Sequence, residues 1–294
     1  MPTKSLEEIA AKESRFEITD YTVYGKLSRT ERQPKLKRVF SELAAMEYGH
    51  YEFWSKYCKN KEIRPDALKI HLVLLMRRVL GGSFIIKYLE GSEAATIKKY
   101  GSMKHIIPKP DRRSFDSMLE DEKGHEQAFA MQIQGTYVLY ISFIVLGLAD
   151  ALVEIAGIHA GSLGIYASTF LTGLAGIVAG AAASISMASA AFVQAKQGFS
   201  GSAKVAAAYT GVSYFISAVL MATPYFLTSS MIVAITSSLI LGMLLIAFIS
   251  WYDSVISGSS FKKDFSELAG IMLAATVALF LFGLVIRHAL GITI

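Results

Sequence analysis

The 294-residue chain carries 29 Lys and Arg and 24 Asp and Glu, and these charges are distributed very unevenly. Only ten of them lie from Gln134 onward, so residues 134–294 are strongly apolar and a purely soluble protein is excluded. The single cysteine, Cys58, excludes an intramolecular disulfide framework and a cysteine-based zinc or iron–sulfur site. A net charge of +5 that mixes many acids with bases favours an anionic membrane surface as a partner, not nucleic acid.

Residues 1–133 show the hydrophobic period of amphipathic helices and no strand pattern. The four expected helices are Leu6–Leu27, Gln33–Cys58, Asp66–Tyr100 and Asp111–Gln134. Four helices of this length are typical of a bundle. We therefore predict an all-α chain that begins with a four-helix bundle.

Residues 134–294 contain five apolar stretches of the length, about 20 residues, that crosses a bilayer core. They are Gly135–Gly157, Ser162–Gln194, Ala203–Pro224, Ser229–Trp251 and Leu268–Arg287. The second stretch is overlong and rich in Gly, Ala and Ser, which allow helix backbones to approach closely. We predict a five-span transmembrane domain in a lipid bilayer, with Gly135 as the hinge to the bundle.

The basic residues of the loops predict the orientation of these spans. Lys196 and Lys204 flank the loop after the second span, and Lys262 and Lys263 precede the fifth. The loops after the first and third spans carry no Lys or Arg. The positive-inside rule then places the amino-terminal bundle in the cytosol and the carboxyl terminus outside, although Arg287 runs against the rule. The polar first thirty residues show no signal peptide, and we expect a multi-pass protein of a prokaryotic cell membrane.

A repeated spacing in the charged half indicates metal binding. Glu47 and His50 stand three residues apart on the second expected helix, as do Glu122 and His125 on the fourth. Residues three apart share a helix face, so each pair presents a carboxylate and an imidazole to one point. Di-iron and di-manganese bundles combine two such pairs with a Glu from each of two other helices. The remaining helices offer Glu17, for which Asp20 is an alternative, and Glu90 with Glu93.

An ordinary structural role is the alternative for each of these residues, because helices rich in Glu contain some Glu-x-x-His pairs by chance. Two pairs near the middle of separate helices, with Glu on the other two, favour the metal site. His71 and His105 lack the spacing and are expected to be ordinary histidines. Cys58 lies near a helix end and is expected to be inert.

The apolar half contains acids, which are costly inside a membrane and therefore indicate function. Asp150 and Glu154 lie four residues apart on one face of the first span and can offer two carboxylates to a cation or a proton. Met187 stands among small residues of the second span, where a thioether favours a softer ion such as Fe²⁺ over Mg²⁺ or Ca²⁺, although packing is its commoner role. His159 is expected to be an interfacial histidine near the outer end of the first span.

The charged half resembles the rubrerythrin branch of the ferritin-like superfamily. The resemblance rests on "FEITDYTVY" around Glu17, "AAMEYGHYEFW" around Glu47 and His50, "YLEGSEAA" around Glu90 and Glu93, and "LEDEKGHE" around Glu122 and His125. It implies a ferritin-like fold and a di-iron site (Fe²⁺/Fe³⁺, or Mn²⁺), in which the extra carboxylate lets an iron shift between ligands. The rubredoxin-type Cys₄ site of many rubrerythrins cannot form with one cysteine.

The apolar half resembles the vacuolar iron transporter family, in "LGLADALVEIAGIHAG", "GLAGIVAGAAASISMASAAFVQAKQ" and "AAAYTGVSYFISAVLMATPYFL". The resemblance implies a metal route lined by Asp150 and Met187, proton-coupled transport and a homodimer. The chain departs from the family where Phe143 and Leu139 replace further acids, and where a short loop replaces Glu-rich helices after the second span. The combined layout is similar to the membrane-bound ferritin, or erythrin–vacuolar iron transporter, group.

Three hypotheses follow from these patterns. The leading one is export of Fe²⁺, with Mn²⁺ as the alternative ion, from the cytosol in exchange for protons, with the bundle supplying or gating the metal. The second makes the bundle a membrane-anchored ferroxidase or an oxygen- or peroxide-consuming di-iron enzyme. The third makes the bundle a metal sensor that only gates the pore. A single span would suffice as an anchor, so Asp150 and Glu154 favour the transporter.

Overall fold

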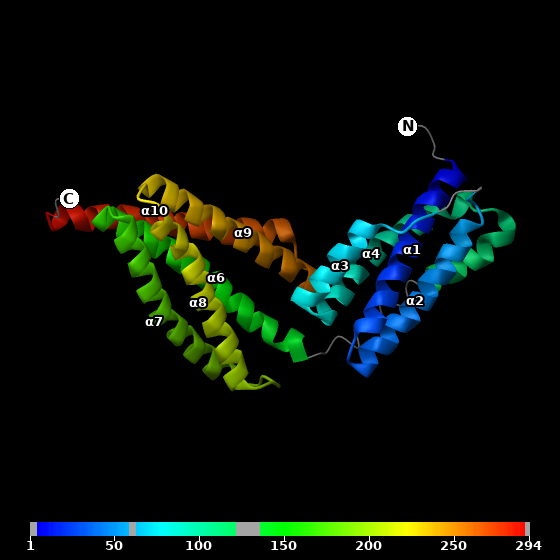
Figure 1. The fold of residues 1–294 in the computed structure, drawn as a ribbon, viewed down its shortest axis with the longest axis horizontal. Helices are drawn as coiled ribbons and strands as arrows, with labels where there is room; N and C mark the ends of the chain where they lie inside the picture. Colours follow the sequence, from blue (N-terminus) through cyan, green and yellow to red (C-terminus); the bar gives the residue numbers. More distant parts are fainter. Residues whose placement is uncertain (1–4, 59–62, 122–135, 292–294) are drawn as a thin grey trace. The chain divides into compact units, whose positions relative to one another are not determined.

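The computed structural model describes residues 5–58, 63–121 and 136–291, with the backbone alone at helical positions 83, 90, 92–98, 102 and 136–139. Throughout these ranges the regular structure is helical, and no strand occurs in them (Figure 1). The chain divides into two compact units, Met1–Ile133 and Gln134–Ile294. We call them unit 1 and unit 2.

Unit 1 begins with two long helices that pack along each other, α1 (Leu6–Thr30) and α2 (Pro34–Ser55). Ser5 and Glu8 form a capping box at the start of α1, in which each side chain accepts a hydrogen bond from the other residue's backbone N–H. Pro34 starts α2, at a helix position where no backbone N–H is needed. Both helices lie close to their predicted bounds.

The third predicted helix, Asp66–Tyr100, is wrong as a single element. The structure divides it into α3 (Ala67–Leu80) and α4 (Gly82–Met103). Gly81 lies between them with a φ of +88°, a backbone conformation that favours glycine because other residues would strain there. The Gly81 N–H still donates to the Arg77 carbonyl, so α3 ends in an ordinary helical bond before the chain turns.

Two short 3₁₀ turns, η1 (Lys104–Ile106) and η2 (Lys109–Asp111), lead from α4 into a helix that is described over residues 112–121. The rest of the fourth predicted helix, and the proposed hinge at Gly135, lie outside the described residues. This helix shares one hydrophobic core with α1, α2 and α4. The buried members of that core are Ala10, Phe53, Trp54, Tyr100, Ile107, Phe115 and Met118.

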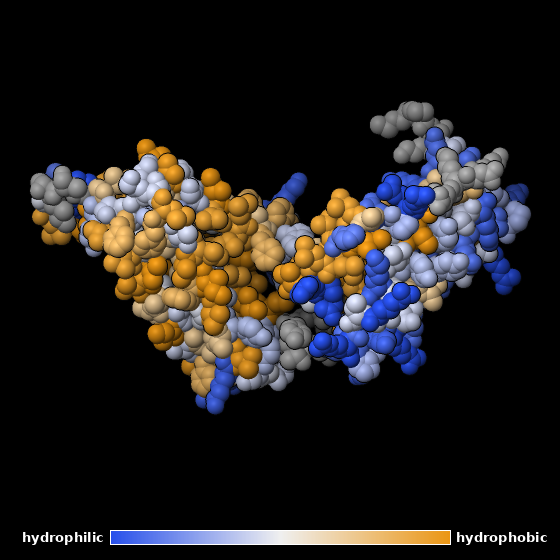
Figure 2. All heavy atoms as spheres, in the orientation of Figure 1, coloured by the Kyte–Doolittle hydropathy of each residue, from blue (hydrophilic) through white to orange (hydrophobic). Residues whose placement is uncertain are grey.

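Over residues 136–291, unit 2 contains five helices that are long and apolar enough to cross a membrane. They are α6 (Thr136–Tyr166), α7 (Thr169–Ala195), α8 (Ala203–Leu227), α9 (Met231–Ser257) and α10 (Phe261–Ala289). The number of membrane-length helices agrees with the prediction, whereas the predicted ends were less accurate: α6 continues past Gly157 to Tyr166, so α7 begins later than Ser162. Figure 2 shows apolar residues covering much of the face of unit 2 that it presents.

The helices of unit 2 pack closely, α7 against α8 and α10 against α6. At the crossing of α6 and α10, a Cβ placed on Gly283 would lie 2.3 Å from the carbonyl oxygen of Gly161. Only a residue without a side chain permits that distance, which is how small residues bring membrane helices together. The buried core of this unit is centred on Leu152, Ile155 and Tyr214, with Met187 packed at its edge.

Candidate metal-binding site

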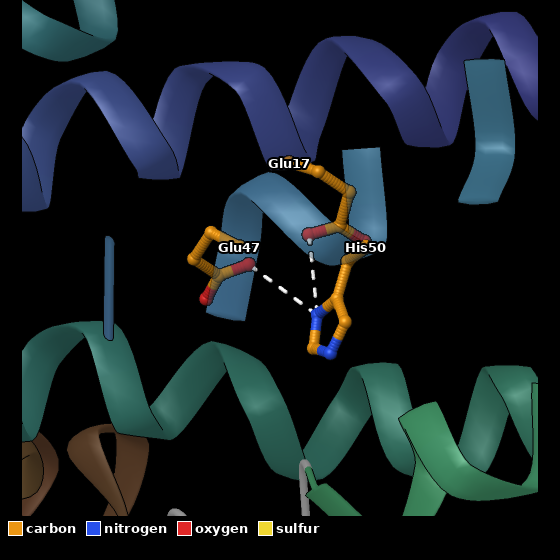
Figure 3. A group of neighbouring side chains, drawn as sticks. All are labelled: Glu17, Glu47 and His50. Atoms are coloured by element: carbon orange, nitrogen blue, oxygen red, sulfur yellow. Dashed lines mark ion pairs between the residues drawn. The ribbon is translucent and has the colours of Figure 1, made fainter. Parts of the chain in front are cut away.

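A buried cluster of two carboxylates and one imidazole lies between α1 and α2. Glu17, Glu47 and His50 are each no more than 5% exposed, and each offers a ligand atom within 4.8 Å of the others. The Nδ1 atom of His50 lies 3.6 Å from Oε2 of Glu47 and 4.0 Å from Oε2 of Glu17 (Figure 3). Three of the residues expected to bind metal therefore come together in space.

The helices explain why these three side chains meet. Glu47 and His50 are one turn apart on α2 and face α1, and Glu17 lies midway along α1 on the side that packs against α2. Asp20, the alternative to Glu17, instead accepts a hydrogen bond of 2.6 Å from the Lys69 ammonium group on α3. The structure thus selects Glu17 over Asp20 as the member of the cluster.

The electrostatics of the cluster favour a cation. Burial raises the pKa of the Glu17 carboxyl well above its ordinary value, and the neighbouring Glu47 carboxylate raises it further. His50 and Tyr100 lower the pKa of Glu17 but do not outweigh these effects. Two carboxylates in so little water repel each other, and a positive ion between them would offset both the repulsion and the lost hydration.

The spacing of the ligand atoms is compatible with a transition-metal ion. Two ligand atoms that each lie about 2.1 Å from one ion are roughly 3–4 Å apart. The distances from His50 to Glu47 and to Glu17, 3.6 and 4.0 Å, fall in that range. Carboxylate oxygen with imidazole nitrogen is a donor set that suits Fe²⁺ and Mn²⁺.

Two aromatic side chains that the sequence analysis did not identify support the cluster. The Tyr100 hydroxyl, from α4, donates a hydrogen bond to Oε1 of Glu17, and Trp54 Nε1 donates to the Tyr100 oxygen over 3.1 Å. Both rings are fully buried. Such partners fix the orientation of a metal-binding carboxylate. No spacing rule marks Tyr100, because it reaches Glu17 from a distant part of the chain.

The side chains of the other four expected ligands lie outside the part of the chain that the structure describes. Glu90 and Glu93 lie within α4, where the structure describes their backbone but not their side chains. Glu122 and His125 lie outside the described residues. The second half of the expected ligand set therefore stays a prediction.

A cavity of about 680 Å³ opens beside His50, between α2 and the helix over residues 112–121. Its polar lining combines one cation, Lys56, with two acids and three hydroxyl groups: Glu52, Asp121, Ser55, Ser114 and Ser117. Hydroxyl and carboxylate oxygens attract a hydrated cation. The cavity therefore offers a polar approach to the imidazole side of the cluster.

The two acids of α6 lie in a more open setting than Glu17 and Glu47 of unit 1. Glu154 accepts a hydrogen bond of 2.6 Å from the buried Tyr214 hydroxyl on α8, yet Glu154 itself is exposed in the single chain. Asp150, one turn earlier on α6, is partly buried. Met187 is also partly buried, at the edge of the core that contains Tyr214. The structure thus places these groups along one helical core, without a closed ligand cluster among them.

The expectation for His159 was wrong. It is only 1% exposed, and neither of its ring nitrogens has a hydrogen-bond partner among the residues that the structure describes. The ring contacts Tyr225 at a centroid distance of 4.4 Å and lies so close to Gly176 that an added Cβ would be 2.0 Å from Nε2. His159 is therefore enclosed between α6, α7 and α8, where an interfacial histidine was expected.

His71, His105 and Cys58 are placed as ordinary residues. His71 and His105 are exposed, and His71 contacts the Ala67 carbonyl oxygen on its own helix. Cys58 is partly buried and lies within hydrogen-bond distance of Ser14. None of the three belongs to the cluster around Glu17.

Comparison of the chain with protein-family models, with curated proteins and with solved structures finds no match in any of the three. The assignment of a function therefore rests on the chemistry of the described side chains and on the motifs in the sequence.

Proposed function

We propose that the protein exports a divalent metal ion, Fe²⁺ or alternatively Mn²⁺, from the cytosol in exchange for protons, and that unit 1 binds the ion and supplies or gates it. The observation that carries this proposal is the buried group of Glu17, Glu47 and His50 in a chain that also has five membrane-length helices. A soluble storage protein would not need those helices. A simple channel would not need a buried ligand cluster.

The donor set of the cluster fits this ion class. Oxygen and imidazole donors without thiolate are typical of iron and manganese sites in helical bundles. A complete di-metal site would add Glu90, Glu93, Glu122 and His125, in the arrangement that the resemblance to rubrerythrins implies. In this role the chain's own residues bind the ion, hold Glu17 through Tyr100, and shield the cluster from bulk water.

The acids on α6 supply the membrane part of the proposal. A charged side chain at the centre of a membrane helix costs about 2.5–3.5 kcal/mol on insertion, so Asp150 and Glu154 require a compensating role. A carboxylate that alternately takes a cation and a proton provides one, and Met187 is expected to add a thioether ligand on the same route. Tyr214 would hold Glu154 in place between these states.

The exposure of Glu154 in the single chain favours an assembly of two copies. A carboxylate facing acyl chains is unfavourable, whereas a second subunit or a water-filled route between subunits would cover it. We therefore include a homodimer in the proposal. The proposed topology keeps the amino-terminal bundle cytosolic and the carboxyl terminus outside a cell membrane, as the Lys-containing loops predict.

Metal-driven proton flux in proteoliposomes tests the transport route. We expect Asp150→Asn to abolish flux, because the amide can neither release a proton nor attract a cation. Asp253→Asn is the matched control, since Asp253 is at the end of α9 and bonds to Ser257. Metal binding by unit 1 should persist in both variants. Full flux in Asp150→Asn would remove this residue from the route, and absence of flux in the unmodified protein would refute the transporter.

Ferroxidase activity is the second candidate function, and one observation favours it. Tyr100 and Trp54 form a hydrogen-bonded pair of oxidisable side chains that ends on Glu17. We would measure oxygen uptake by the full-length protein after addition of Fe²⁺, beside the Tyr100→Phe variant. Rapid uptake that the variant loses supports an oxidase role for unit 1. Uptake no faster than in buffer would leave unit 1 as a binding and delivery module.

A further inference from the structure

A stripe of aliphatic side chains stands exposed on α3, in unit 1. Its four members, Leu68, Leu72, Leu75 and Val79, are 70%, 50%, 59% and 72% exposed. Steps of four, three and four residues place all of them on one face of the helix. Figure 2 shows apolar atoms gathered over this part of unit 1, whose surface is otherwise largely hydrophilic.

The opposite side of α3 packs against the rest of unit 1, so the stripe faces away from the core of that unit. Ile70 and Val73 are buried, and the Arg77 guanidinium donates a hydrogen bond to Glu31. Lys69 bonds to Asp20 on α1. The helix cannot turn its stripe inward without losing these contacts. Four such exposed aliphatic side chains on one helix face form an apolar patch of the kind that marks a binding surface.

The charges around the stripe identify what covers it. Helix α3 contains three cations, Lys69, Arg77 and Arg78, and no acidic residue. Lys69 and Arg77 pair with Asp20 and Glu31, so Arg78 is the exposed cation of the described helix. His71 and Arg78 are both exposed, and helical geometry places them along one edge of the stripe. An apolar stripe with a basic edge is the pattern of a helix that lies in the plane of a membrane surface, with its aliphatic side chains among the acyl chains and its cations among anionic headgroups.

We propose that the stripe of α3 binds the anionic headgroup surface of a lipid bilayer. The same chain contains membrane-length helices, the first of which begins at Thr136, so a segment that would lie in a bilayer is close to unit 1 in the sequence. This interaction is separate from metal transport and does not depend on it. It would tether unit 1 to the membrane surface through a face that the metal cluster does not use.

A second copy of the chain is the rival occupant, since the four-three-four spacing also occurs in coiled coils. Two copies joined stripe to stripe would bring basic edges together and offer no acidic partner on α3 to either. The described helix has 14 residues, which is short for an independent coiled coil. Charge complementarity therefore favours anionic lipid over a second copy.

The test uses the full-length protein in lipid nanodiscs. In a Cys58→Ser background, Leu72→Cys carries an environment-sensitive nitrobenzoxadiazole label, and Lys35→Cys, at an exposed position of α2, is the matched control. We expect a blue-shifted emission at position 72 that nitroxide-labelled lipid quenches at least twofold more than at position 35. The difference should be greater in phosphatidylcholine mixed with phosphatidylglycerol than in phosphatidylcholine alone.

An added Arg78→Glu substitution should reduce the quenching at position 72, while thermal melting shows that the protein stays folded. Two results would overturn the proposal. One is a disulfide that joins two unlabelled copies of the Leu72→Cys variant through position 72, without lipid quenching of the labelled protein, which would assign the stripe to a subunit interface. The other is a water-like emission at position 72 in both lipid compositions, which would leave the stripe exposed.

Discussion

The carboxylates proposed to bind metal lie in opposite environments in the two units. In unit 1, Glu17 and Glu47 are each 5% exposed and share a cluster with His50. In unit 2, Asp150 is partly buried, Glu154 is exposed, and the described partner of Glu154 is a single tyrosine hydroxyl. A closed cluster can retain an ion, because release must re-expose buried charges. An open pair can exchange a cation for a proton, because neither state is enclosed.

The two environments nevertheless share one feature: in each, a buried tyrosine donates a hydrogen bond to a carboxylate. Tyr100 donates to Glu17 from α4, and Tyr214 donates to Glu154 from α8. A hydroxyl donor orients a carboxylate and still leaves its other lone pairs for an ion. Under the proposed function, the difference between binding in unit 1 and passage through unit 2 would therefore depend on burial and on the imidazole, not on the tyrosine.

Removing a ligand from the closed cluster should produce the largest effect. We expect Glu47→Gln combined with His50→Ala to lower metal affinity by more than about 100-fold, since loss of an outer partner alone typically costs 10–100-fold. Elemental analysis of the purified full-length protein gives the metal content. Glu42→Gln is the control on the same helix, because Glu42 is exposed and pairs only with Arg38 among the described contacts. Equal metal content in both variants would contradict the site.

Substitution of Tyr100 and of Tyr214, one in each unit, should distinguish the roles of the two units. Tyr100→Phe should weaken metal binding by about 10–100-fold and leave flux at saturating metal largely intact. Tyr214→Phe should do the reverse, lowering flux while metal binding by unit 1 is unchanged. Binding isotherms and proteoliposome flux, measured on the same preparations, check both. If either variant impaired both properties equally, the division of labour between closed and open carboxylates would be wrong.

The pH dependence of stability gives a third test of the closed cluster. Because the pKa of Glu17 is raised in the folded protein, the folded state holds more protons than the unfolded state between the ordinary value and the raised one. The stability that this group contributes is present at low pH and is lost as the pH rises through that window. Glu17→Gln should remove this loss, so the metal-free variant melts at a higher temperature than the parent at neutral pH.

Added Fe²⁺ or Mn²⁺ should reverse the order of the two melting temperatures, so that the parent melts above Glu17→Gln. An ion that binds only the folded parent raises its melting temperature by mass action, whereas Glu17→Gln has lost a ligand and gains less. Thermal melting in detergent, with and without metal, measures both effects. If the metal-free Glu17→Gln variant melted below the parent at neutral pH, the charged carboxylate would stabilise the fold, and a role in metal binding would not be needed to explain its burial.

Local patterns in the sequence predicted most of the helices and the three members of the cluster, with Asp20 as an alternative to Glu17. The three-residue spacing of Glu47 and His50 and the apolar lengths of the spans are local features, and the structure shows both. The turn at Gly81 was missed because the hydrophobic period continues through it. Tyr100 and Tyr214 could not be predicted, since each reaches its carboxylate from a distant helix. The choice of Glu17 over Asp20 likewise depended on where Lys69 lies in space.

His159 marks the part of unit 2 that is as closed as the cluster in unit 1, and a double-mutant cycle tests that enclosure. Gly176→Ala should destabilise the protein by about 1–3 kcal/mol, because its new Cβ would meet the imidazole in a filled space. In a His159→Ala background the same change should cost much less, since the ring is gone. Gly270→Ala is the control: no atom lies within 4 Å of its added Cβ, so it should be neutral or stabilise by about 0.5–1 kcal/mol. Equal costs of Gly176→Ala in both backgrounds would mean that His159 is not enclosed against α7, and the contrast between a closed His159 and an open Glu154 would then fail.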